Sequence, residues 1–299
     1  MRLARYILII SFIFFYFFPV SLGAETEVRK IATWNMKWLG TSSGNQLDAV
    51  ENVADYVDVI IGTGATLFAL QEIGATHSEE GIAKCYYLDL IIRELKARQN
   101  INWRYILDNV NKNQRLAFLY REDKWKLTYT ESIKPGKSFY SIRKPFVAFV
   151  SGVHNDFYFY FINIHFKAFS SATKKRIANT KELTKWIVDY LDSKSTSSKL
   201  IIAGDTNYYP TESDIENIFR KGYMTPIYDD ENTVIYKQRS DVRFDRFYAS
   251  LGLLGAIYES SPSEDLVDVI KKDNQNYISW FEKTISDHFP VVMNIIVDK

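Results

Sequence analysis

The chain has 299 residues, of which 46% are apolar and 15% aromatic; this is enough to bury a large core and excludes an intrinsically disordered chain. The formal charge is +1, which excludes strong non-specific binding to polyanions, so any nucleic-acid contact must come from a local patch. Cys85 is the only cysteine, so an internal disulfide is excluded and stability must come from packing.

Residues 1–24 have the pattern of a secretory signal peptide. Two arginines precede an apolar run over residues 7–18, which ends at Pro19, and small residues follow up to Ala24. An uncleaved membrane anchor is the alternative, but a spanning helix needs roughly 20 apolar residues. We therefore expect cleavage after Gly23 or Ala24 and a secreted or periplasmic protein without a membrane span. Loss of the two arginines changes the formal charge from +1 to −1.

The N-terminal half alternates short β-type runs with helical patterns. Residues 30–34 form the first predicted strand, and Leu47, Val50, Ala54 and Val57 follow the helical period, which predicts a helix over 46–58. Further strands are predicted at 66–70, 104–107, 116–120 and 125–130, and a second helix at 86–97. The chain shows no internal repeat and no linker, so we expect a single domain over residues 25–299.

The C-terminal half begins with a predicted hairpin, formed by residues 146–150 and 157–164 around a turn. Its second arm is apolar at nearly every position, as in a strand covered on both faces. A long helix is marked by Ile177, Leu183, Ile187 and Leu191. Strands follow at 200–203, 247–249 and 291–296. Hairpins with interspersed helices indicate mixed sheets flanked by helices, an α/β fold.

Polar side chains stand at the ends of these predicted strands. Asn35, Glu72 and His165 each come just after a strand. Asp205 and Asn207 follow the 200–203 strand, and Asp287 and His288 precede the last one. Side chains at strand ends are held on a rigid frame, where sites commonly form, so we expect one constellation.

Five of these segments resemble the ordered motifs of the endonuclease/exonuclease/phosphatase (DNase I-like) superfamily. They are Thr33-Trp34-Asn35, Leu70-Gln71-Glu72, Asn163-Ile164-His165-Phe166-Lys167, Gly204-Asp205-Thr206-Asn207 and Ser286-Asp287-His288. Three more stretches resemble it: residues 115–120, Arg143-Lys144-Pro145 and Phe244-Asp245-Arg246-Phe247-Tyr248. The resemblance spans nearly all of the processed chain. It implies a four-layer sandwich of two mixed β-sheets flanked by helices.

The resemblance also implies a metal-assisted phosphoester hydrolase site. Its metal would be Mg²⁺ or Mn²⁺, held by the Glu72 carboxylate with Asn35 as a neutral neighbour. Asp287 would bind a second ion or hold its loop. Such an ion stabilises charge on the phosphoryl oxygens.

The remaining motif residues would carry the proton transfers and phosphate contacts. His288 oriented by Asp245 resembles a catalytic triad with water in place of a serine. Asp205 would position or deprotonate that water, and the choice of general base between Asp205 and His288 stays open. Asn207 would hydrogen-bond the phosphate, and His165, if protonated, would donate to the developing oxyanion.

Three residues are candidate substrate contacts. Arg143 suits either phosphate binding or a structural salt bridge, and Tyr120 is either a phosphate contact or a plain sheet residue. Lys167 opens a basic stretch that suits either a phosphate backbone or a solvated helix face. The stretch continues with Lys174, Lys175, Arg176, Lys181 and Lys185.

The expected function is that of an endonuclease acting on DNA or RNA, with nucleic acid as the substrate and no stable protein partner. The Arg143-Lys144-Pro145 segment favours this reading. The alternative is an inositol-phosphate phosphatase or a sphingomyelinase-like lipid phosphodiesterase. The segment from Gly204 to Tyr208 faintly resembles the inositol-phosphatase form of its motif. A third hypothesis is a catalytically inactive binding domain, which has no need of complete acid and histidine motifs.

Overall fold

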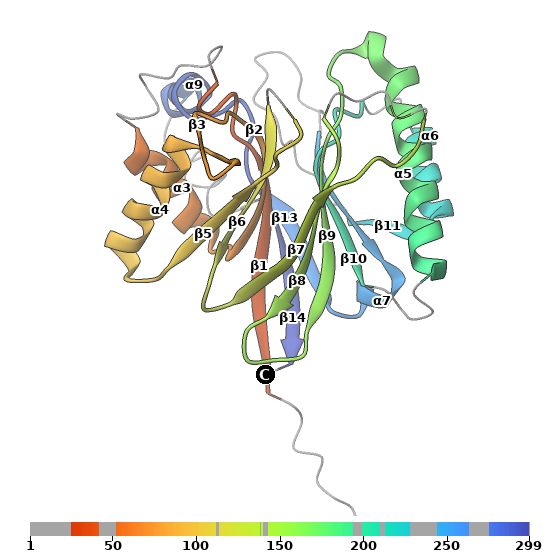
Figure 1. Ribbon diagram of the computed structural model, residues 1–299, viewed down its shortest axis with the longest axis horizontal. Coiled ribbons are helices and arrows are strands. Elements are labelled where there is room, and N and C mark those ends of the chain that lie inside the picture. Colours follow the sequence, from red (N-terminus) through yellow and green to blue (C-terminus); the bar gives the residue numbers. More distant parts are fainter. Residues whose placement is uncertain are drawn as a thin grey trace, which may run out of the picture.

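The computed structural model describes residues 25–41, 52–111, 114–137, 139, 143–193, 199–209, 213–227, 244–262 and 275–298. In this part of the chain, two six-stranded mixed sheets pack face to face and helices cover both outer faces (Figure 1). The prediction of a four-layer α/β sandwich is confirmed. Residues 1–24 lie outside the described residues, so export remains a prediction. No described helix is both long and apolar enough to cross a bilayer.

The first sheet has the strand order β13-β14-β1-β2-β6-β5. Its strands are β1 (Thr26–Asn35), β2 (Leu67–Ile73), β5 (Trp103–Leu107), β6 (Arg115–Arg121), β13 (Ile257–Pro262) and β14 (Val291–Asp298). Only β1 and β2 are parallel; the other neighbours are antiparallel. The ends of β1 and β2 therefore meet the start of β14 at one edge.

The second sheet has the order β11-β12-β10-β9-β8-β7. Its strands are β7 (Trp125–Ser132), β8 (Phe146–Gly152), β9 (Tyr158–His165), β10 (Leu200–Asp205), β11 (Met224–Ile227) and β12 (Asp245–Ser250). Here β9 and β10 are parallel and end together, opposite the start of β12. We call the edge where β1, β2, β9 and β10 end, and where β12 and β14 begin, the site edge.

The interface between the sheets is an apolar core of inward-facing strand residues. Phe118 of β6 lies 5.1 Å from the ring of Phe146 and 5.3 Å from that of Phe161, both from the second sheet. Aliphatic residues such as Ile201 and Met293 fill the rest of this layer and are fully buried. Burial of each such side chain stabilises the fold by roughly 1.5–3 kcal/mol. The site edge thus stands on a rigid base.

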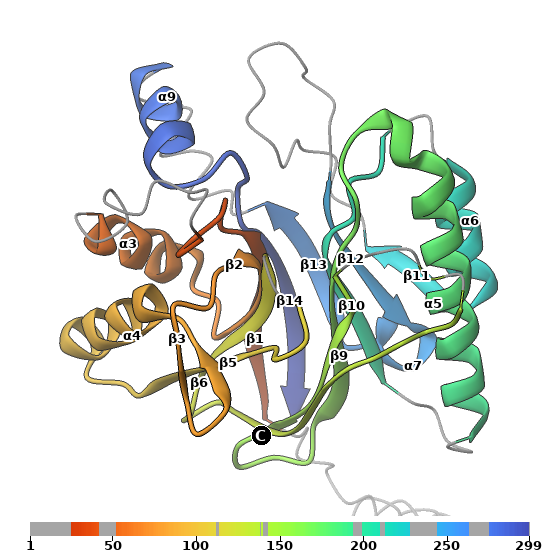
Figure 2. The same cartoon turned by 45° about the horizontal axis from the view of Figure 1, so that its top comes forward.

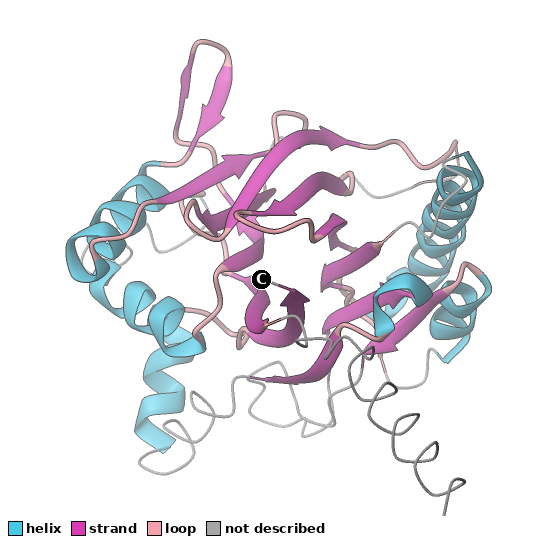
Figure 3. Ribbon diagram, turned by 90° about the horizontal axis from the view of Figure 1, so that it is seen from below, coloured by secondary structure: helices cyan, strands magenta, loops and turns pink. Residues whose placement is uncertain are grey.

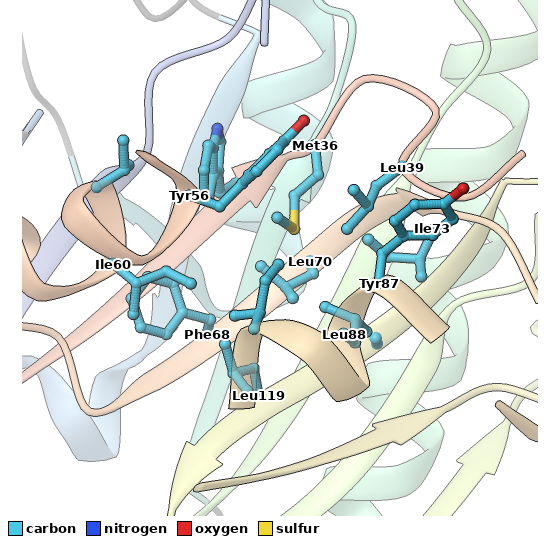
Figure 4. Close-up of a cluster of buried hydrophobic side chains, with 14 of the residues drawn as sticks. Met36, Leu39, Tyr56, Ile60, Phe68, Leu70, Ile73, Tyr87, Leu88 and Leu119 are labelled. Carbon is cyan, nitrogen blue, oxygen red and sulfur yellow. The ribbon is translucent and has the colours of Figure 1, made fainter. Parts of the chain in front are cut away.

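Helices α3 (Val53–Thr63), α4 (Tyr86–Gln99) and α9 (Gln275–Thr284) lie on the outer side of the first sheet (Figure 2). Beneath them is a second apolar cluster, in which Tyr56 and Ile60 of α3 and Leu88 of α4 face β2 side chains such as Phe68 and Leu70 (Figure 4). A hairpin of β3 (His77–Glu79) and β4 (Ile82–Lys84) projects from this side (Figure 3).

The outer side of the second sheet is covered by α5 (Thr173–Ser193) and α6 (Ser213–Lys221). Leu183 and Ile187 of α5 and Phe219 of α6 are buried in a third apolar cluster with strand residues. Because α5 connects the parallel strands β9 and β10, its N-terminus lies at the site edge and its C-terminus at the opposite edge. Two short helical elements, η1 (Ser170–Ala172) and α7 (Leu251–Leu254), lie in connecting segments.

Every strand predicted from the sequence overlaps a strand of the structure. The first predicted helix differs: its described part begins at Val53 and continues to Thr63, while residues 46–51 lie outside the described residues. Gly64, with φ +64°, ends this helix in the left-handed conformation that favours glycine. The short strands β3, β4, β11 and β13 and the helices α6 and α9 were not predicted.

Candidate active site

Asn35 and Asp205 connect the two sheets at the site edge. Asn35 is the last residue of β1 and Asp205 the last of β10. The amide nitrogen Nδ2 of Asn35 donates to Oδ2 of Asp205 over 3.0 Å, and both residues are 2% exposed. A carboxylate buried this deeply needs such donors, because an unpaired charge is costly away from water. Burial raises the pKa of Asp205 to about 7.

Glu72 lies near the end of β2, where the pairing with β6 shifts register between Leu70 and Ile73. Its φ is +61°, an unusual backbone conformation for a residue other than glycine. Irregularities of this kind redirect a side chain out of the regular alternation of a strand. Oε2 of Glu72 accepts a hydrogen bond from the backbone N–H of Trp38 over 3.2 Å. Burial raises the pKa of Glu72.

The imidazole of His165 lies between two carboxylates. Its Nε2 is 3.4 Å from Oδ2 of Asp205 and 3.6 Å from Oε1 of Glu72. Burial, together with the charges of Arg143 and His288, holds the pKa of His165 well below its usual range. This shift favours the neutral imidazole, which donates from one nitrogen only.

His288 forms an acid–imidazole pair with Asp245. Its Nδ1 lies 2.7 Å from Oδ2 of Asp245, and its Nε2 lies 4.0 Å from Oδ2 of Asp205. Burial opposes protonation, but the Asp245 carboxylate outweighs it and raises the pKa of His288 to about 10. Ser286 fixes the segment: its hydroxyl donates to the Asn35 carbonyl over 2.7 Å and accepts from the His288 N–H over 3.0 Å. The predicted pairing is present.

Asn207 is held in the turn after β10. Its backbone N–H donates to Oδ1 of Asp205 over 2.9 Å, and its Nδ2 donates to the Phe166 carbonyl over 3.1 Å. Its φ of +51° is one that asparagine adopts more readily than most residues. The Tyr208 hydroxyl lies 2.6 Å from Thr180 Oγ1 in a buried position. Tyr208 is thus a packing residue. Its resemblance to an inositol-phosphatase motif therefore adds no group to the site.

Two of the candidate substrate and metal residues lie close to these groups. Arg143 is buried, and its guanidinium donates to Gln114 Oε1 and, over 3.2 Å, to the Phe166 carbonyl. Burial lowers the pKa of Arg143, while the charges of Asp205 and Glu72 oppose that shift. Asp287 is half-buried, and its charge acts on both Glu72 and His288.

Tyr120 does not lie at the site. It pairs with Leu67 at the start of β2, whereas Glu72 lies five residues further along that strand. At about 3.3 Å per residue, the separation is roughly 17 Å. Tyr120 packs in the core between the sheets, so the expectation that it contacts the phosphate is corrected.

The basic stretch divides into two parts. Lys167, Lys174 and Lys175 are exposed at the site edge or in the first turn of α5. Lys181 and Lys185 are also exposed, but at about 1.5 Å per residue along α5 they lie roughly 12 and 18 Å further from that edge. Arg176 is fully buried and donates to carbonyls of the preceding loop. The prediction that Arg176 belongs to an exposed basic surface is therefore wrong.

A buried amide pair lies directly beneath the site. Nε2 of Gln71, the residue before Glu72, donates to Oδ1 of Asn163 over 2.8 Å and to Thr33 Oγ1 over 3.0 Å. Nδ2 of Asn163, two residues before His165, donates to the carbonyls of Leu70 and Ala117. Both amides are fully buried and connect the sheets. Sequence reasoning missed this role, although both residues stand within the quoted motifs.

The oxygen groups suit a hard cation with a sparse set of protein ligands. Within the described ranges, no group of three His, Cys, Asp or Glu side chains is arranged to hold a metal alone. Mg²⁺ keeps several waters and binds one or two carboxylates together with substrate phosphate. The Glu72 carboxylate, with the Asn35 amide beside it, fits this requirement. Oδ1 of Asn35 accepts from the backbone N–H of Lys37 over 3.0 Å.

The site edge of this four-layer sandwich gathers acids, amides and histidines from two sheets. This arrangement defines the DNase I-like endonuclease/exonuclease/phosphatase superfamily, whose members are phosphoric ester hydrolases. Residues 32–247 match Endonuclease/Exonuclease/phosphatase family 2, and the chain belongs to this family. No curated protein sequence matches the chain.

Three solved structures illustrate the shared fold. The mannosyl-6-phosphatase of Bacteroides thetaiotaomicron is 17% identical, with a TM-score of 0.58 over 90% of this chain and 99% of its own. D. rerio TDP2 complexed with a single-strand DNA product is 14% identical, with a TM-score of 0.58 over 91% and 99%. The human nocturnin catalytic domain with a bound sulfate anion is 14% identical, with a TM-score of 0.61 over 95% and 100%.

Proposed function

We propose that this protein is an exported, divalent-metal-dependent phosphodiesterase that hydrolyses nucleic acid. The observation that carries the proposal is the convergence of Asp205, His165 and the Asp245–His288 pair on one buried point beside Glu72. A buried cluster of titratable groups with perturbed pKa values is typical of a catalytic centre. A binding module would gain nothing from holding these acids and histidines together away from water.

The geometry favours separate roles for Asp205 and His288. Both ring nitrogens of His288 face carboxylates, Asp245 at Nδ1 and Asp205 at Nε2, so the imidazole is held as a cation. We assign Asp205 as the group that orients the attacking water and accepts its proton. His288 would stabilise charge on a phosphoryl oxygen, as would one N–H of His165.

Glu72 and Asn35 would hold the divalent cation. When bound, this ion would neutralise charge on the phosphoryl oxygens and on the departing oxygen. Asn35 has a second task, since its Nδ2 donates to Asp205 over 3.0 Å. The carboxylate that accepts the proton is thereby kept at a fixed position relative to the cation-binding carboxylate.

The choice of nucleic acid is supported by the surface around this point. Lys167, Lys174 and Lys175 are exposed and follow His165 closely in the chain, where they would contact phosphates flanking the cleaved one. The processed chain is close to neutral, so binding would depend on this local group. The TDP2 structure with its DNA product shows that this fold accommodates a strand.

A phosphatase acting on a small phosphomonoester is the second candidate. The observation that favours it is the depth of the site, because Asp205 and His165 are each only 2% exposed. The mannosyl-6-phosphatase shares the fold to the same degree as the DNA-bound neighbour. Inositol phosphates and lipid headgroups are further candidate substrates for such a site.

The purified protein should nick supercoiled plasmid DNA in Mg²⁺ or Mn²⁺, and EDTA should abolish the reaction. Glu72→Gln should lower the rate roughly a thousandfold, because several kcal/mol of charge stabilisation is lost with the cation. The matched control is Glu122→Gln: Glu122 pairs with Arg104 on the surface, and such pairs contribute little to stability. Gel densitometry measures the rates.

The proposal has two clear points of failure. Intact DNA and RNA, together with phosphate release from inositol phosphates or mannose 6-phosphate or with phosphocholine release from sphingomyelin, would replace the nuclease by the second candidate. Full activity of Glu72→Gln on every substrate would remove the assigned site. A thermal melt of each variant separates loss of catalysis from loss of fold.

A further inference from the structure

Phe169 is a large apolar side chain presented to solvent beside the active site. It is 71% exposed, the highest value among the exposed large hydrophobic residues of the described chain. It lies four residues after His165, so its backbone is within roughly 14 Å of that catalytic histidine. Its φ of +75° is an outlier for a bulky residue. Such conformations persist only where the surroundings impose them, and they cluster at functional sites.

The surroundings that impose it centre on Arg176. This fully buried guanidinium donates through Nη1 to the carbonyls of Lys167 and Phe169, both over 2.8 Å, and through Nη2 to Thr173 Oγ1 over 3.1 Å. Hydrogen bonds from a charged donor are about twice as strong as neutral ones. The exposure of the Phe169 ring is therefore not the result of a loose loop, because the main chain beneath it is fixed.

The segment that carries Phe169, residues 166–172, is the Phe169 loop, and it is continuous with the active site. At its start, the Phe166 carbonyl accepts hydrogen bonds from Asn207 and Arg143. At its end, the Arg176 guanidinium stacks over the ring of Tyr209, 5.3 Å from its centroid.

Aromatic rings extend this connection to the catalytic imidazole. Tyr209 meets Phe244 edge-on with centroids 5.3 Å apart, and the Phe244 ring lies 6.5 Å from that of His288. Arg176, Tyr209 and Phe244 thus form a packed wall between His288 and the Phe169 loop.

We propose that Phe169 is a specificity-determining residue that stacks on a nucleobase of the substrate, next to the cleaved phosphate. This inference rests on the proposed nuclease function. Nucleobases stack on aromatic side chains in a sequence-tolerant manner, because every base has a π-face. Lys167, exposed two residues earlier, supplies a positive charge for the adjoining phosphate. The pairing of a fixed exposed ring with a nearby cation matches a nucleotide, whereas a sugar phosphate has no planar base.

The test compares two oligonucleotide substrates of equal length, one of thymidines and one with tetrahydrofuran abasic residues around the cleaved bond. Phe169→Ala should raise KM for the thymidine strand roughly tenfold, equivalent to about 1.4 kcal/mol, with kcat unchanged. The abasic strand should be cleaved equally by both proteins. Phe169→Trp should restore the wild-type KM.

Tyr223 provides a matched control. It is also an exposed aromatic residue, at 57%, with a positive φ of +61°. It precedes Met224, which pairs with Ser250 at the edge of the sheet opposite the site, so Tyr223→Ala should leave both substrates unaffected. Thermal melts of all variants verify folding.

The outcomes distinguish this inference from the function on which it rests. Wild-type protein that cleaves both strands, with Phe169→Ala altering both equally or neither, overturns the stacking role and leaves the nuclease function intact. Wild-type protein that cleaves neither strand but releases phosphate from monoesters overturns the nuclease function, and the stacking role with it.

Discussion

Asp245 determines what His288 can do. Its Oδ2 lies 2.7 Å from Nδ1 of His288, in a position that is almost completely buried. A buried carboxylate at this distance selects the tautomer and orientation of the ring and favours its cationic form, as in hydrolase triads. The other ring nitrogen, Nε2, thereby lies 4.0 Å from Oδ2 of Asp205.

Asp245→Asn is therefore expected to lower kcat by roughly two to four orders of magnitude, because the isosteric amide keeps the shape but removes the charge. KM should change little, since the substrate contacts remain. Steady-state kinetics give both values. Asp123→Asn is the matched control: Asp123 is exposed and pairs with Arg121 on the surface. An unaltered kcat in Asp245→Asn would contradict the role of the pair.

At the scale of the elements, strand direction decides which residues reach the site edge. The residues placed correctly from sequence, such as Asn35 and Asp205, follow strands that end there. Tyr120 also stands near the end of its strand, but β6 runs antiparallel to β2 and begins at the site edge. Strand pairing is not readable from one sequence, so Tyr120 could not have been placed correctly.

The direction in which a helical side chain points was also not predictable from the sequence. Arg176 stands in a run of lysines, and charge alone predicted a solvated or phosphate-binding face. In the structure it turns inward and donates to the carbonyls of Lys167 and Phe169. Phe169, whose carbonyl also accepts from the Ala172 backbone N–H over 3.0 Å, adopts a left-handed conformation that the sequence does not reveal.

Gly204 lets β9 and β10 approach each other directly before Asp205. Its φ is +144°, and a Cβ there would lie 1.9 Å from the Ile164 carbonyl oxygen. Gly204→Ala should lower the free energy of unfolding by about 3 kcal/mol, through backbone strain and overpacking combined. Urea denaturation measures the change. Gly255→Ala, where an added Cβ meets no atom within 4 Å, should be nearly neutral. Equal stabilities of the two variants would refute the close approach.

At the scale of the whole molecule, the site is assembled from two halves. Asn35 and Glu72 belong to the first sheet, whereas His165, Asp205 and Asp245 belong to the second. Their relative position depends on how the sheets are fixed against one another. The apolar core alone is not directional. The buried Gln71–Asn163 pair adds a directional contact directly below the acids.

This pair can be tested by a double-mutant cycle. Asn163→Leu and Gln71→Met should each lower the free energy of unfolding by roughly 3 kcal/mol, because buried partners lose their hydrogen bonds. The double variant should be more stable than the sum predicts, by about 1–2 kcal/mol, since the two amides share one bond. Chemical denaturation gives all three values. Strict additivity would show that the amides act independently.

The pair also shows why this level of organisation escaped prediction. Gln71 and Asn163 stand in strands whose preceding inward residues are apolar, and no periodicity marks an amide that hydrogen-bonds to a partner on another sheet. The order of strand-end motifs predicted which residues converge. The contacts that hold them at a given distance depend on packing between sheets, which is a property of the folded chain.

The two ends of the domain emerge side by side. The start of β1 lies beside the end of β14 (Figure 1), where Thr26 pairs with Asp298. From there β1 runs ten residues to Asn35, a distance of roughly 30 Å. A tag or resin joined to either end of the domain would consequently lie at the end of the sandwich opposite the site edge. An immobilised form of this protein would keep its site edge toward the bulk solution, where large polymers could reach it without entering the space between protein and support.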